Sequence, residues 1–156
     1  MSSFSSFRDL INYVQRKIDD VLINEVTNEV KRVELKHIAE DVMQVYIPKQ
    51  YERRDTGGIE DPDNINGELV RPGTLEVKNT TTFSPDPESN NFGTGLVGLI
   101  EHGDGWNGHR YEYGNNNAEY KGPRPFVQNT KNDLKNNSKH IEALKKGLKK
   151  HNIIAK

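Results

Sequence analysis

Three residues with metal-binding side chains lie close together in a glycine-rich stretch: His102, Asp104 and His109. Imidazole and carboxylate groups are zinc ligands, so this stretch is where a metal-dependent hydrolase would be built. Its spacing matches no helix-borne motif such as H-E-x-x-H. A metal site also needs converging ligands held by supporting hydrogen bonds, and this spacing does not indicate them. We therefore expect no metal site.

Signatures of nucleophilic catalysis and of phosphate binding are missing as well. The chain has no cysteine and no G-x-S-x-G elbow, the usual settings of an activated nucleophile. The glycine pairs at Gly57-Gly58 and at Gly93-Thr94-Gly95 lack the Lys-Ser/Thr ending of a phosphate loop, so they predict turns. The sequence predicts neither an enzyme nor a cofactor.

Two arginines are better candidates for binding a partner. Arg53 and Arg54 follow Tyr51 in a loop between Pro48 and Gly57. Guanidinium groups hold carboxylates in a fixed fork, and Arg and Tyr are enriched at interface hot spots. The two arginines either clamp a partner or form a surface pair on the loop, and the sequence alone leaves both interpretations open.

Charge is distributed unevenly along the chain. Residues 120–156 hold ten Lys/Arg and two Asp/Glu, a net charge of +8, so residues 1–119 carry the balance of −9. Such a basic tail can bind nucleic acid or the acidic body of a neighbouring copy, and we favour the second. The tail has one arginine and no Tyr or Trp beyond Tyr120, a composition that allows phosphate attraction without sequence-specific reading.

Composition points to a subunit of an assembly. The 156 residues suit a single domain over 1–156, but only 32% are hydrophobic, which suggests stabilisation by neighbours. No apolar run reaches the roughly 20 residues that span a bilayer. The start of the chain also lacks the basic and apolar regions of a signal peptide. With no cysteine, we expect synthesis in a reducing cytoplasm and no membrane partner.

The elements that must position these residues form an α+β pattern. Apolar spacings of three and four predict helix over residues 4–46, either one long helix or two with a break near Thr27-Asn28. A second helix is expected over 126–150, after the rigid run Gly122-Pro123-Arg124-Pro125-Phe126-Val127, in which Phe126 and Val127 supply an apolar anchor. The remaining expectations are strands at 69–71 and 74–82, a strand or short helical turn at 96–101, and loops at 47–68, 84–95 and 102–121.

Taken in order, these landmarks resemble the small neck and tail-completion proteins of tailed bacteriophages, particularly those of prophages in Gram-positive hosts. In that family an Arg-Pro-Phe motif precedes a C-terminal helix, and Arg124-Pro125-Phe126 matches it. The family's Glu-x-Gly strand end is matched by Glu101-His102-Gly103. The resemblance spans about residues 7–150, although Pro123 replaces a small residue and the 102–121 loop is long.

The resemblance implies a small antiparallel sheet flanked by a long N-terminal helix and a C-terminal helix. It implies a ring, commonly a hexamer, at the head–tail junction of the virion, assembled in the host cytoplasm around the path of double-stranded DNA. Tyr51, Arg53 and Arg54 would contact a neighbouring subunit, the tail tube or another neck protein. Arg124 and Phe126 would lock the C-terminal helix to the sheet. The alternative is a nucleic-acid-binding module acting through the basic C-terminal helix.

Overall fold

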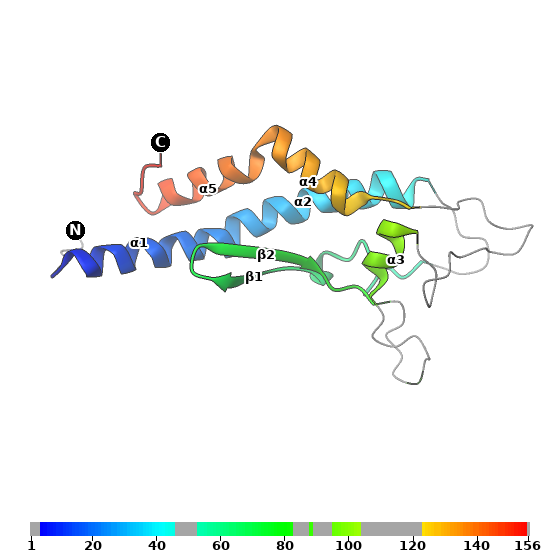
Figure 1. The fold of residues 1–156 in the computed structure, drawn as a ribbon, viewed down its shortest axis with the longest axis horizontal. Coiled ribbons are helices and arrows are strands. Elements are labelled where there is room, and N and C mark those ends of the chain that lie inside the picture. Colours follow the sequence, from blue (N-terminus) through cyan, green and yellow to red (C-terminus); the bar gives the residue numbers. More distant parts are fainter. Residues whose placement is uncertain (1–3, 46–52, 83–87, 89–94, 104–122, 156) are drawn as a thin grey trace, which may run out of the picture.

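The structure is a computed structural model that describes residues 4–45, 53–82, 88, 95–103 and 123–155. Over these residues the fold is α+β, as the sequence indicates: a long N-terminal helix, a two-stranded antiparallel sheet and C-terminal helices. The long helix lies between the sheet on one side and the C-terminal helices on the other (Figure 1). Both termini lie at the same end of this elongated arrangement.

The N-terminal region is one continuous helix, which decides between the two alternatives. It runs through α1 (Phe7–Val21), a π-helical turn η1 (Leu22–Val26), α2 (Thr27–His37) and a second π-helical turn η2 (Ile38–Met43). The Ser6 hydroxyl caps its start by accepting a hydrogen bond from the Asp9 N–H at 3.1 Å. Next to Thr27-Asn28, where the two-helix alternative places a break, the helix widens into η1 instead, and the Thr27 hydroxyl donates to the Leu22 carbonyl at 3.2 Å.

The sheet is a hairpin that starts earlier than the sequence indicates. Strand β1 (Ile65–Arg71) pairs with β2 (Thr74–Asn79), and the turn between them is Pro72-Gly73. The predicted strand starts at 69 and ends at 82 were therefore wrong, and the predicted 47–68 loop includes the start of β1. Buried Ile65 anchors the early start. Beyond β2, the Thr81 hydroxyl donates to Asn79 Oδ1 at 2.6 Å and to the Gly58 carbonyl at 3.2 Å. Residue 81 therefore packs against the 57–58 region and does not extend the strand.

The predicted single helix over 126–150 is two helices, α4 (Phe126–Asn137) and α5 (Lys139–Lys150). Ser138 separates them with a left-handed backbone, φ 56°. Its N–H still bonds to the Leu134 carbonyl at 3.0 Å, while the Asn137 side chain accepts from the Lys139 N–H at 2.9 Å. Short polar side chains that bond to nearby backbone favour such helix ends, and apolar periodicity alone does not reveal them.

A short helix, α3 (Leu96–His102), settles the other open alternative in favour of a helical turn. The Glu-x-Gly motif therefore closes a helix and not a strand. Gly103 follows with φ 66°, the left-handed conformation that commonly ends a helix and that glycine adopts without steric cost. The expected 84–95 and 102–121 loops lie almost wholly outside the described residues.

Candidate functional site

The two motifs that suggested a phage neck protein meet in space. The Glu101 carboxylate of α3 accepts hydrogen bonds from the Val127 N–H at 2.8 Å and the Gln128 N–H at 3.0 Å. These are N–H groups of the first turn of α4, which have no partner inside that helix. A carboxylate at a helix N-terminus is also favoured by the helix dipole. We call this arrangement, Glu101 together with 124–128, the α4 clamp.

The backbone completes the α4 clamp. The Arg124 N–H donates to the Ile100 carbonyl at 2.9 Å, so the chain before α4 lies against the end of α3. The N-cap residue, just before α4, is Pro125, whose side chain has no oxygen that could cap the helix. A remote acceptor must therefore satisfy the first turn, and Glu101 does so. Both motifs are visible in the sequence, but their pairing is not, because the missing side-chain cap at Pro125 is the only sign of it.

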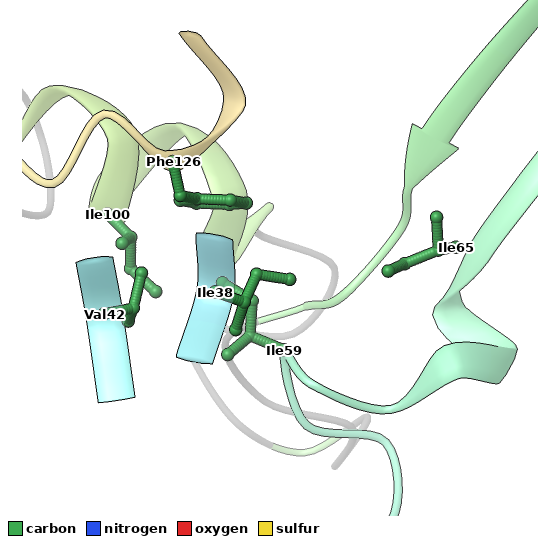
Figure 2. Packing of buried hydrophobic residues seen from close by; sticks show 6 residues of the cluster. All are labelled: Ile38, Val42, Ile59, Ile65, Ile100 and Phe126. Atoms are coloured by element: carbon green, nitrogen blue, oxygen red, sulfur yellow. The ribbon is translucent and has the colours of Figure 1, made fainter. Parts of the chain in front are cut away.

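Phe126 carries the apolar half of the clamp. Its side chain is fully buried and shares a core with Ile38 and Val42 of the long helix and Ile100 of α3. Ile59 and Ile65 complete this cluster (Figure 2). Because only Ile65 belongs to a strand, Phe126 fastens α4 mainly to α3 and the long helix. The predicted locking of the C-terminal helix to the sheet is therefore indirect.

Each of the two arginines bonds to backbone of its own chain. Arg53 Nη2 donates to the Met43 carbonyl at 3.1 Å, and Arg54 Nη2 donates to the Thr82 carbonyl at 2.5 Å. Both residues are half-buried. They fasten residues 53 and 54 to η2 and to the segment beyond β2, a role that neither interpretation of the arginine pair described. Tyr51 lies outside the described residues, and contact of the three with a neighbour stays a prediction.

In comparison with known protein families, the sequence model of the YomN family matches residues 6–150 of the chain. The chain belongs to the YomN family. This family is phage-associated, in agreement with the phage origin that the resemblance implied. No curated protein and no solved structure matches the chain. Assignment to the neck goes further than this match and stays a prediction.

A second contact of α4 in this YomN-family protein is polar and lies on α2. His37 places Nδ1 3.1 Å from Asp41 Oδ2 and Nε2 3.3 Å from Asp133 Oδ2. Lys36 Nζ lies 3.3 Å from the same Asp133 oxygen, and this hydrogen bond holds the pKa of the Asp133 carboxyl below its usual value. Asn129 adds a bond to Asp41 at 2.8 Å. Both ring nitrogens of His37 thus lie beside carboxylates. The contacts of His37, Asp41, Asn129 and Asp133 fasten α4 to the long helix.

The third polar feature is a buried acid, Glu34, on the face of α2 near the α4 clamp. Only 7% of the residue is exposed, and its Oε1 makes no hydrogen bond to the described part of the chain. Burial raises the pKa of the Glu34 carboxyl, and repulsion from Glu101 adds to the shift, while a hydrogen bond with Asn79 opposes it. The YomN-family fold therefore favours the protonated acid at this position more than the unfolded chain does.

The metal hypothesis finds no support in the described residues. His102 lies exposed at the end of α3, whereas Asp104 and His109 fall outside the described part of the chain. Among residues that the structure places, no three His, Asp or Glu side chains gather as metal ligands. Nor does any described helix have the length and apolarity to cross a membrane.

Replacing Glu101 with glutamine tests the α4 clamp. Glutamine keeps one acceptor oxygen but turns an NH2 group toward a backbone N–H and removes the charge. We expect the free energy of unfolding to fall by about 1–3 kcal/mol, the range for a charge-assisted bond and an orphaned donor. Chemical denaturation measures it. The control is Glu40→Gln, since the exposed Glu40 has only a 4.0 Å pairing with Lys36. Equal effects from the two changes would contradict the clamp.

Replacing Glu34 with glutamine should stabilise the protein at neutral pH. Because folding raises the pKa of Glu34, the folded state binds the proton more tightly, and stability falls as pH rises from about 4.3 through the raised folded pKa. A glutamine at residue 34 does not titrate, so the variant does not lose stability in this way. The difference in unfolding free energy between variant and parent should grow as pH rises through this range and should be constant at lower pH. Denaturation at a series of pH values measures the difference. Glu60→Gln, at an exposed residue, should show no such growth.

Proposed function

We propose that this protein is a structural subunit of the phage neck, which completes the tail and joins it to the head as part of a ring around the DNA path. It acts in the virion after assembly in the host cytoplasm, and no catalytic step is involved. The observation that carries the proposal is the α4 clamp. The resemblance to neck proteins rests on the order of short motifs, and Glu101 of one motif caps the helix that begins at the end of the other, Arg124-Pro125-Phe126.

The distribution of charge supports a ring built from copies of the chain. Closed rings use unlike patches on each subunit that meet head to tail. The outer faces of α4 and α5 carry exposed lysines, and the rest of the chain is acidic. Attraction between a basic patch and an acidic one favours this pairing and disfavours patches of like sign.

The first experiment is the native mass of the purified protein, alone and mixed with the tail-tube protein of the same phage, by analytical ultracentrifugation. We expect a ring, or a complex that forms only on mixing. A mixture with an unrelated acidic protein of similar size serves as the control. A monomer in all three samples would reject the proposal.

One observation favours a second candidate, a nucleic-acid-binding module. Helices α4 and α5 lie on one side of the long helix (Figure 1). Their exposed lysines include Lys131, Lys135, Lys145, Lys146 and Lys149. Binding through such side chains releases counterions, so affinity for duplex DNA should fall steeply with salt. A gel-shift assay at low salt tests this, and the absence of any shift would remove the candidate.

A further inference from the structure

The first two turns of α1 extend past the hairpin and past α5, the described elements that flank this end of the long helix. The hairpin turn reaches α1 at Asp19, where the Gly73 N–H donates to Asp19 Oδ1 at 2.7 Å. On the other side the end of α5 reaches Asp20, where His151 Nε2 lies 3.2 Å from Asp20 Oδ2. Residues 7–14, here called the projecting segment, continue beyond both elements toward the N-terminus (Figure 1).

An apolar stripe continues along this segment, and in the described part of the chain its first residues stay open to solvent. Phe7, Leu10 and Ile11 are 77%, 37% and 51% exposed, whereas Val21, on the same stripe, is 2% exposed. Two uncovered helical turns have little stability of their own in water. Exposed apolar side chains in one row are also the mark of an interaction surface. A further protein surface is therefore expected to cover the projecting segment.

Basic residues beside the apolar row indicate the charge that the covering surface should carry. At 100° per residue, Arg8 and Lys17 flank the row of Phe7, Ile11 and Val14 on opposite sides. An occupant should therefore present apolar side chains among carboxylates. The lysine-rich face of α5 on another copy would be repelled.

The outer face of the hairpin has the required chemistry. Strand residues alternate between two faces: Gly67 lies against Thr27 of the long helix, so Glu68 and Val70 point away from it. Val70 is 55% exposed. Lys78 Nζ lies 2.9 Å from Glu68 Oε1 on the facing strand and 2.9 Å from Glu76 Oε2 on its own strand. Residues 55–79 hold six Asp/Glu and two Lys/Arg, a net charge of −4.

We propose that the projecting segment of one copy docks on the outer hairpin face of the next copy, with Phe7 and Ile11 against Val70 and Arg8 beside Glu68. The inference rests on the proposed ring and names the two surfaces that would form it. Each copy offers both surfaces, and its own hairpin presents the inner face to the long helix. The contact is therefore head to tail, the type that closes into rings.

Cysteine cross-linking tests the contact, and the chain is suited to it because it has no cysteine. Phe7→Cys and Val70→Cys are made as separate proteins, mixed and treated with a short bismaleimide. We expect a cross-linked dimer in the mixture and none in either protein alone. Val45→Cys replaces Val70→Cys as the matched control and should not cross-link to Phe7→Cys. Val45 is 45% exposed and follows the C-terminal end of the long helix, η2, which ends at Met43.

A charge swap gives an independent measurement of the same contact. Arg8→Glu should weaken self-association roughly tenfold or more, because like charges would then face each other. Combining it with Glu68→Lys should restore association. Both changes are at exposed positions, so we expect each variant to fold. Circular dichroism checks this.

The outcomes separate this inference from the proposed function. An oligomer in which Phe7→Cys fails to cross-link with Val70→Cys overturns the docking and leaves the ring. Cross-linking of Phe7→Cys alone, showing contact between projecting segments, also overturns it. So does a Phe7→Ala variant that self-associates normally and loses binding only to the tail-tube protein. A monomer that ignores the tube protein rejects the proposed function itself.

Discussion

Phe126→Ala is expected to lower the free energy of unfolding by about 3–5 kcal/mol, the range for truncating a buried aromatic side chain. Phe126 is fully buried where α3, α4 and the long helix meet. Its removal leaves a cavity at the clamp that positions α4, and the neighbouring isoleucines and Val42 can fill it only in part. Guanidinium denaturation followed by far-UV circular dichroism measures the loss.

Phe7→Ala is the matched control for this prediction, because the same atoms are removed from a residue that is 77% exposed. Its effect on the unfolding of the monomer should stay within about 0.5 kcal/mol. Comparing the two variants separates the effect of burial on the unfolding free energy from the effect of replacing phenylalanine with alanine. Similar losses in the two variants would contradict the described core, and a Phe126→Ala protein without a cooperative transition would count as a loss beyond the expected range.

Gly147→Ala should destabilise the protein by about 1–3 kcal/mol, although alanine favours helices more than glycine does. A Cβ at residue 147 would come under 3.0 Å from Val21 Cγ1, and Val21 is 2% exposed. This glycine lets α5 approach α1 closely, so a methyl group must push the two helices apart. Thermal unfolding with a fitted enthalpy measures the change.

Gly98→Ala serves as the opposite case within a helix. Gly98 lies exposed in α3, and a Cβ there would meet no atom within 4 Å. The same substitution should therefore stabilise the protein, by up to about 1 kcal/mol. Opposite signs at the two glycines would establish the close approach of α5 to α1, whereas a gain at both would contradict it.

The sequence determined the elements whose signals are local. The apolar spacing of 7–45 predicted the long helix, and the absence of Gly or Pro within it is consistent with the single helix observed. The prolines around Arg124 correctly marked the start of α4. Burial of Phe126 followed from an apolar residue at a rigid helix start. These features depend on backbone preference and on period, which neighbouring residues fix.

Tertiary structure decided what depends on residues far apart in the chain. Glu101 caps a helix that begins 25 residues later, and Arg54 bonds to the Thr82 carbonyl. Burial of Glu34 likewise depends on elements that pack over α2. No spacing rule links such residues, because their contact is set by how elements pack.

The break at Ser138 and the early start of β1 have a similar cause. Side-chain bonds of Asn137 and burial of Ile65 outweighed the periodic pattern at these positions. Propensity is a weak preference that packing and local hydrogen bonds override. The sequence alone thus determined that the N- and C-terminal regions are helical and that a helix starts at Phe126. Only the tertiary structure placed Glu101 at the start of that helix, since this contact depends on packing between distant segments.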